Sequence, residues 1–281
     1  MPGRRLTLRV AVLRVGIVAS IVAAGLVAGA VNGVGPLAQV TPPNQVADPR
    51  EVIARSLQSA IDASSVHVVV SLAGHVPGAL VGRSGEVVDL NGTQAVLDLR
   101  PQDARSHVAV ASPSLGIELE AVTHWDALAY RTPGGAWATG SLGSLAGATG
   151  IDANPLTLVD RLRAWLAAPG APMPQEDDVA CDAPSGQCRQ VTLSLGSAPG
   201  SLLAPLVPGV GAATLGATRT DLVLLADAAT LRPAHLVLMV RNGDGSLALT
   251  VQVDTSSWDW PSVIPDPPGG VTVAGPPTMT G

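Results

Sequence analysis

The sequence predicts an α+β fold in which about ten antiparallel strands form one strongly curved sheet wrapped around helices. Residues 246–254 alternate between polar and apolar side chains, which is typical of a strand with one dry face. Short turn sequences such as Asn91-Gly92 lie between strand candidates, and short turns favour antiparallel pairing. Two helix candidates begin with an N-cap residue followed by proline, at Asp48-Pro49 and Asn154-Pro155.

Residues 1–31 are predicted to export the chain. Four arginines precede an apolar run at residues 15–31, and Ala28-Gly29-Ala30 matches a signal-peptide cleavage site. If it stays uncut, the same run is just long enough to anchor the chain in the cytoplasmic membrane, with the arginines inside. Both alternatives place the remaining chain in the cell envelope, on the periplasmic side, and the sequence leaves them open. No cysteine stands just after the run, where a lipoprotein signal would need one.

The charge of the chain argues against nucleic acid as a partner. The chain has 16 basic residues, all arginine, against 22 acidic ones. The first thirty residues hold four of the arginines and no acid, so the exported part is more acidic than the whole. An acidic surface repels phosphate backbones.

The folded domain is expected to cover residues 48–265, between a linker at 32–47 and a disordered tail at 266–281. Asp48 and Glu51 form a capping-box pattern at the start of its first helix. Apolar residues then repeat every four positions, so this helix should lay a narrow apolar stripe on the sheet. The second helix shows a similar stripe. The stripe residues are Ile53, Leu57 and Ile61 in the first helix, and Leu158, Leu162 and Leu166 (or Trp165) in the second.

Ten segments have the composition of strands, because β-branched and other apolar residues dominate them between turn residues. Asn91-Gly92 predicts a hairpin between the second and third segments, and residues 242–245 predict another between the last two. The segments are residues 66–72, 86–90, 95–100, 107–111, 117–122, 127–131, 190–195, 220–225, 235–241 and 247–254.

Cys181 and Cys188 are the only cysteines of the chain. Two thiols across a turn that contains proline and glycine, in an exported chain, predict a disulfide that closes a small loop. A zinc site needs about four ligands, and no histidine pair stands near these cysteines.

Residues 196–216 form an uncharged apolar segment with three prolines and several glycines. Long apolar loops of this kind are uncommon unless they serve as lids or binding elements. A buried core segment, a lid over an apolar cavity and a disordered loop all remain open here. Leu202, Leu203 and Leu206 are the residues that would guard the mouth of a cavity.

Three motifs carry a family resemblance that spans roughly residues 51–265. They are Gly135-Ala136-Trp137, the strand from Asp221 to Asp227 followed by Leu231-Arg232-Pro233, and the ending from Val251 through Trp258 to Pro261 and Ile264-Pro265. With a leading helix and a curved antiparallel sheet, the chain resembles the LppX/LprAFG lipoproteins of actinobacteria and the related LolA/LolB lipoprotein carriers. The resemblance implies a half-open barrel whose helices plug the concave face and enclose an apolar cavity for acyl chains. Trp258 and Trp260 are expected to pack the end of the sheet.

No enzyme motif stands out, so the chain is interpreted as a binding protein that needs no cofactor or metal. G-x-S-x-G, H-E-x-x-H and Walker sequences are absent. His67, His107 and His235 lie in or beside strand candidates, where a satisfied or solvent-facing histidine is usual. His124-Trp125-Asp126 is expected to be a turn, and the acidic run at residues 176–178 a solvated loop.

The predicted function is the binding of an acylated ligand (a lipid, glycolipid or lipoprotein) for transport or retention in the envelope. The predicted ligand contacts are the helix and loop leucines and isoleucines named above, and a membrane transporter is a possible partner. The alternative is a membrane-anchored sensor or interaction domain of the same fold that signals through a protein partner.

Overall fold

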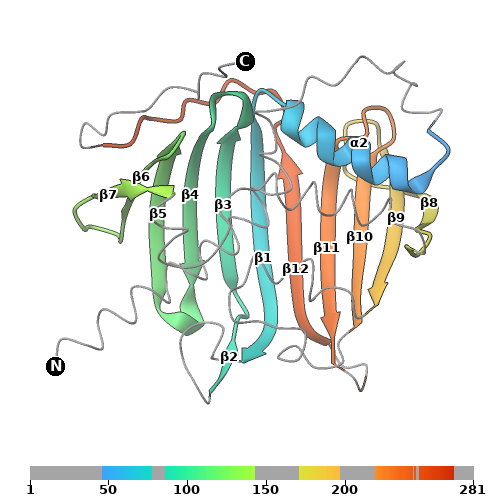
Figure 1. Cartoon of the computed structure of the whole chain (residues 1–281), viewed down its shortest axis with the longest axis horizontal. Coiled ribbons are helices and arrows are strands. Elements are labelled where there is room, and N and C mark those ends of the chain that lie inside the picture. Colours follow the sequence, from blue (N-terminus) through green and yellow to red (C-terminus); the bar gives the residue numbers. More distant parts are fainter. Residues whose placement is uncertain are drawn as a thin grey trace, which may run out of the picture.

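The computed structural model describes residues 46–77, 86–142, 171–196, 219–242, 244 and 247–268. Twelve strands form one antiparallel sheet in the order β7-β6-β5-β4-β3-β1-β12-β11-β10-β9-β8, with β2 paired to the end of β1 (Figure 1). The strands are β1 (Val66–Pro77), β2 (Val87–Asp89), β3 (Thr93–Arg100), β4 (Arg105–Ser112), β5 (Ile117–His124), β6 (Ala127–Arg131), β7 (Ala138–Ser141), β8 (Gln175–Ala180), β9 (Gln187–Gly196), β10 (Arg219–Asp227), β11 (Pro233–Arg241) and β12 (Leu247–Ser256).

The sheet consists of two meanders that meet at β1 and β12 in its centre (Figure 1). Strands β3 to β7 run outward from β1 to one edge and form the first half. Strands β8 to β12 run inward from the other edge and form the second half. The antiparallel α+β prediction is confirmed, and within the described residues the sheet is open because β7 and β8 lie at opposite edges.

Several predictions concern segments outside the described residues. These segments are the export signal, the helix that begins at Asn154, and the apolar loop beyond Gly196. In the described part of the chain, no helix has the length and apolar content needed to cross a membrane.

All ten predicted strands are present, and the two that the sequence did not predict are the edge strands β7 and β8. β7 is built from small residues, and β8 carries the acidic run that was expected to be a solvated loop. That expectation is wrong: Glu176 lies opposite Val191 of β9 and its carboxylate binds Arg189. Charged residues on an edge strand discourage pairing with other chains, which accounts for a strand of this composition.

The predicted hairpin at Asn91-Gly92 is wrong. The turn is present, but the strands on either side of it both pair with β1, β2 through Pro77↔Val87 and β3 through Leu72↔Thr93. β1 is long enough to pair with both in succession. At Gly74 the backbone has φ +118°, and a Cβ there would lie 2.3 Å from the carbonyl oxygen of Ala248. Only glycine therefore fits at this position of β1.

Helix α2 (Pro49–Asp62) lies across the second half of the sheet, on β9, β10 and β11 (Figure 1). Asp48 caps it, because its Oδ1 accepts the Arg50 N–H at 2.9 Å. The reciprocal half of the predicted capping box is wrong: the Glu51 carboxylate accepts from Arg55 Nε at 2.9 Å instead. An arginine four residues later competes for the glutamate on the helix surface.

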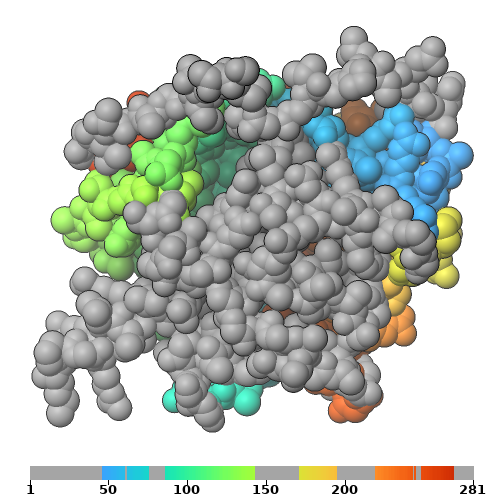
Figure 2. Space-filling model, in the orientation of Figure 1, coloured from blue at the N-terminus to red at the C-terminus, as the bar shows by residue number. Residues whose placement is uncertain are grey.

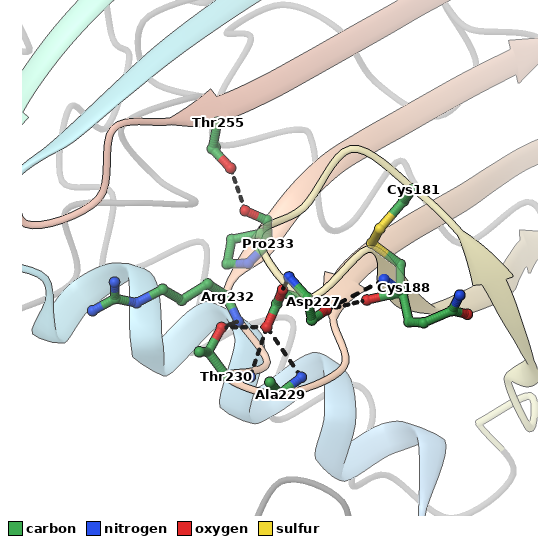
Figure 3. Close-up of a disulfide and its surroundings, with 10 residues drawn as sticks. Cys181, Cys188, Asp227, Ala229, Thr230, Arg232, Pro233 and Thr255 are labelled. Atoms are coloured by element: carbon green, nitrogen blue, oxygen red, sulfur yellow. Dashed lines mark hydrogen bonds between the residues drawn. A yellow bond between two sulfur atoms is a disulfide. The ribbon is translucent and has the colours of Figure 1, made fainter.

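The predicted disulfide between Cys181 and Cys188 is confirmed, with Cα atoms 5.8 Å apart (Figure 3). It closes the hairpin of β8 and β9, in which Val179 lies opposite Cys188. Cys188 is fully buried, so the crosslink joins the edge strand to the core.

Asp227 fastens the disulfide hairpin to the turn between β10 and β11 (Figure 3). Its side chain accepts the backbone N–H groups of Ser185 at 3.0 Å, Ala229 at 3.0 Å and Thr230 at 2.8 Å. Burial raises the pKa of Asp227, but the hydrogen bonds from Ser185 and Thr230 lower it by more, so the pKa lies below its ordinary value. The carboxylate therefore stays ionised while only 2% exposed.

The closing segment after β12 crosses the end of the sheet and returns to the first half. Trp258 packs against the core as expected. Trp260 does not: it is 69% exposed, so the prediction that it packs the sheet's end is wrong. Ser257 and Asp259 both adopt positive φ, which bends the chain at each side of Trp258. Beyond them Ile264 is buried again.

Candidate functional site

The candidate site is the inner face of the sheet, defined here as the face on which α2 lies. Directly paired residues of neighbouring strands point to the same face. One row of eight paired apolar residues crosses eight strands and is buried throughout. From β5 to β9 it consists of Leu119, Val110, Ala95, Val70, Val253, Leu236, Leu224 and Val191. At roughly 4.8 Å per strand, this row is about 34 Å wide.

The predicted helix residues lie on this face. Ile53 is 1% exposed and Leu57 is 2% exposed, and both belong to the core cluster with the sheet residues. Val52 and Ala60 are also buried, so the apolar stripe of α2 is wider than the every-fourth-residue pattern suggested. The side chain of Ile61 lies outside the described part, as do Leu158, Leu162, Leu166, Leu202, Leu203 and Leu206.

The inner face continues beyond α2. Among described elements, the strands that the helix mainly contacts are β9, β10 and β11, yet the apolar rows extend through β3, β4 and β5. Four inner-face side chains of the sheet pack against the core but are only half-buried: Ala121 and Tyr130 in the first half, Leu238 and Leu249 in the second. The sheet thus presents accessible apolar surface on the same face as its core.

Polar side chains on the inner face are confined to its margins and are mostly satisfied. Thr93 and Ser112 pair their hydroxyls at 2.7 Å at one end of β3 and β4, while Ser106 and Thr123 pair at 2.6 Å at the other end of β4. At the β8 edge, Glu176 binds Arg189 in a nearly buried ion pair. The band between these margins is apolar, which suits hydrocarbon and no charged ligand.

The outer face has a different chemistry. A ladder of ionisable side chains crosses β1, β3, β4, β5 and β6. Its contacts are His67 Nδ1 to Asp98 Oδ1 at 2.8 Å, His107 Nε2 to Glu120 Oε1 at 3.1 Å, and Arg131 to Glu120 Oε2 at 2.6 Å. On the second half, His235 pairs with Asp254 at 2.5 Å.

Glu120 is the best-supported carboxylate of this outer ladder. Hydrogen bonds from Arg131 and then His107 lower its pKa. The predicted interpretation of His67, His107 and His235 as satisfied strand histidines is confirmed, and His124-Trp125-Asp126 forms the expected turn between β5 and β6. Within the described residues, no cluster of three or more His, Cys, Asp or Glu side chains could hold a metal ion.

The half-buried sheet residues of the inner face were not identified from the sequence. Only helix and loop residues were predicted as contacts, although Leu238 and Leu249 lie in predicted strands. The signal that could have found them is the strand alternation: in residues 247–254 the apolar positions 247, 249, 251 and 253 share one face.

Comparison with known proteins gives a fold but no sequence family. No protein-family model and no curated protein matches the chain. Among solved structures, the lipoprotein LppX of Mycobacterium tuberculosis superposes with a TM-score of 0.50 at 17% identity, covering 77% of this chain and 98% of LppX.

Two further matches are more distant. An uncharacterized conserved protein from Thermus thermophilus has a TM-score of 0.34 at 11% identity, covering 74% of this chain and 85% of its own. A LolA superfamily protein from Nitrosomonas europaea has a TM-score of 0.25 at 11% identity, covering 78% of this chain and 96% of its own length. The chain has the LppX-like fold that the sequence predicted.

Proposed function

We propose that the chain is an exported envelope protein that binds an acylated ligand (a lipid, glycolipid or lipoprotein) against the inner face, for transport or retention. The observation that carries this proposal is the apolar row across eight strands, together with the half-buried Leu238 and Leu249 on the same face. The LppX-like fold supports it, because the family resemblance implies the same use of this face.

The physical chemistry of the face favours hydrocarbon. Each methylene removed from water contributes about 0.8 kcal/mol, so roughly ten buried methylenes contribute about 8 kcal/mol before the costs of association. At the margins the hydroxyls of Thr93 and Ser112, and those of Ser106 and Thr123, bond to each other. The second predicted helix and the loop at 202–206 would complete the enclosure, and Ile53 and Leu57 would line it from α2.

Export is supported by two features of the chain. Residues 1–31 have the charge and apolar pattern of a signal or anchor. The Cys181–Cys188 disulfide persists in oxidising compartments such as the periplasm. Retention of residues 15–31 would hold the protein at the cytoplasmic membrane, and a transporter there would deliver or accept the ligand. Binding alone, without catalysis, accounts for the features described.

Two neighbouring residues of β11 provide a matched test. Leu238 lies opposite Leu222 and Val251 on the inner face, while Val237 lies opposite Val223 and Gln252 on the outer face, and both are half-buried. Leu238→Gln is expected to weaken binding of a fluorescent long-chain acyl probe about tenfold, equivalent to about 1.4 kcal/mol. Val237→Gln should leave the affinity unchanged.

Thermal unfolding curves first show that both variants fold. The exported protein, stripped of bound lipid, is then titrated with the probe. Equal loss in the two variants, or no binding by the unaltered protein, would contradict the proposal. In the latter case the sensor or interaction domain becomes the better account of the fold.

A further inference from the structure

The segment of residues 257–264, named the docking segment below, presents large apolar side chains to solvent. Trp260 is 69% exposed and Val263 is 94% exposed. Only two other large hydrophobic residues of the described chain, Val87 and Met173, are exposed in this way, and they lie apart from each other in the sequence. Isolated apolar residues on a surface need no explanation, but two exposed side chains three positions apart in one segment need one.

The exposure does not arise from a loose backbone. The Asp259 carboxylate accepts the Ser64 N–H at 2.8 Å, and the Asp259 N–H donates to the Ser65 carbonyl at 2.9 Å. The Ser65 hydroxyl donates to the Trp260 carbonyl. At the other end Ile264 is buried, and its carbonyl accepts from Arg105 at 3.2 Å. The segment is therefore fastened on both sides, with Trp260 and Val263 directed outward between the fastenings.

Charges close to the docking segment are neutralised in pairs. Arg232 binds Asp259, and its guanidinium also lies 5.3 Å from the ring centroid of Trp258. Asp266 binds Arg105 at 3.1 Å and His124 at 2.8 Å. A patch with little net charge suits an uncharged interface better than a charged macromolecule.

Tryptophans gather at this end of the sheet. Trp125, Trp258 and Trp260 are three of the four described tryptophans. Trp258 and Trp260 lie beside Ser65, just before β1. Trp125 lies at the same end, because its backbone N–H donates at 3.0 Å to the carbonyl of Ala104, in the turn between β3 and β4. Tryptophan favours the boundary between a bilayer's acyl chains and water, where its ring is buried and its N–H stays hydrated.

The chain also enters the domain at this end. The Val46 carbonyl accepts from Arg189, which follows Cys188 at the start of β9. The N–H of Ala228, in the turn between β10 and β11, donates to the neighbouring Gln187 carbonyl at 3.0 Å. Residues 32–46 can extend at most about 50 Å. A retained apolar segment at 15–31 would therefore tether this end of the sheet within about 50 Å of the bilayer.

We propose that the docking segment binds a bilayer surface and inserts Trp260 and Val263 into its interfacial region. This orients the sheet with the end that carries Trp260 toward the membrane. The inference does not depend on a cavity, since both side chains lie outside the inner face.

The test uses the exported full chain with zwitterionic phosphatidylcholine vesicles, either plain or brominated on the acyl chains. If the N-terminal segment is retained, the chain is reconstituted into the same vesicles. Bromine quenches tryptophan that reaches the acyl region. Trp260→Phe is expected to lose a large part of the quenching. Adding Val263→Trp to that variant should restore it.

Val87→Trp in the Trp260→Phe background is the matched control. Val87 is 75% exposed and pairs with Pro77 at the far end of β1, about 40 Å from Ser65 at the usual rise per residue. Its tryptophan should remain unquenched. Equal quenching of the tryptophans at positions 263 and 87, or none at 263, would overturn the proposal. If the segment instead binds a protein or a second copy of this chain, the tryptophan at position 263 should not be quenched.

Discussion

The two halves of the sheet are held in different ways. In the second half, α2 covers β9 to β11, a disulfide closes the β8–β9 hairpin, and the buried Asp227 joins that hairpin to the next turn (Figure 3). In the first half, hydroxyl pairs and an outer ladder of half-exposed ion pairs connect the strands. In the space-filling view α2 and the β5–β7 edge form the surface on opposite sides of the molecule (Figure 2).

This difference indicates where stability is concentrated. Buried apolar contacts, buried hydrogen bonds to a charge and a crosslink each add on the order of 1 kcal/mol or more to the free energy of unfolding, whereas exposed ion pairs add little. We therefore expect the second half to unfold with the whole domain. The outer strands of the first half should open more readily, which suits the part of the proposed binding face that would admit a ligand.

Leu57→Ala should have the largest effect. The side chain is 2% exposed between α2 and the second half, so its removal leaves a cavity that costs about 4 kcal/mol. Urea unfolding measures the loss. Gln58→Ala, on the neighbouring half-exposed position, should change stability by less than about 0.5 kcal/mol. Similar losses in both variants would show that α2 does not anchor the second half.

Asp227→Ala should rank next, at about 3 kcal/mol, because it leaves the backbone donors of Ser185, Ala229 and Thr230 without their acceptor. Asp182→Ala, at an exposed acid within the disulfide loop, is the control and should be nearly neutral. Hydrogen exchange of β9 and β10 should accelerate only in the first variant. Unchanged exchange there contradicts the anchoring role of Asp227.

Replacing Cys181 and Cys188 together by serine should cost about 2 kcal/mol, since the disulfide closes only a short loop. The loss should appear as a lower midpoint in urea without a change in the first half's exchange rates. If the double variant is as stable as the unaltered protein, the disulfide does not stabilise the second half.

The smallest change is expected in the first half. Glu120→Gln should cost less than about 1 kcal/mol, because the ion pair with Arg131 is half-exposed. Salt should reduce this difference further, and urea midpoints with and without about 1 M sodium chloride measure it. A loss as large as that of Asp227→Ala would mean that the two halves are held equally.

Acid should remove the contribution of Asp227 to the second half. The folded pKa of Asp227 lies below its ordinary value of 3.8, so its contribution is present above that pH and is lost as pH falls through the folded pKa. The same sign holds for Asp259, where burial raises the pKa and hydrogen bonds from Ser64 and Arg232 lower it by more. Asp227→Asn should flatten the fall in stability below about pH 4.

Much of the fold could be predicted because strand alternation and turn chemistry are local. The ten strands that were predicted have β-branched or alternating apolar residues, as at Val66–Pro77. The two edge strands were missed because most of their side chains are exposed, so no buried face selects alternating apolar residues. The Asn91-Gly92 hairpin failed for a different reason: the turn is local, but the partner on either side is the distant β1.

The candidate site could be predicted only in part. Ile53 and Leu57 were found because helical spacing reveals a buried stripe. The role of Asp227 depends on donors from a hairpin more than forty positions away, and no local pattern encodes that contact. The exposure of Trp260 likewise depends on how Ser64 and Ser65 hold the backbone of the tail.

The most direct test of ligand binding is native mass spectrometry of the protein, purified without added lipid, followed by organic extraction and lipid analysis. We predict a mass increment of one acylated molecule per chain that survives purification and is recovered in the extract. A clean mass for the protein alone, with no uptake when envelope lipids from the host are supplied, would contradict the proposed function.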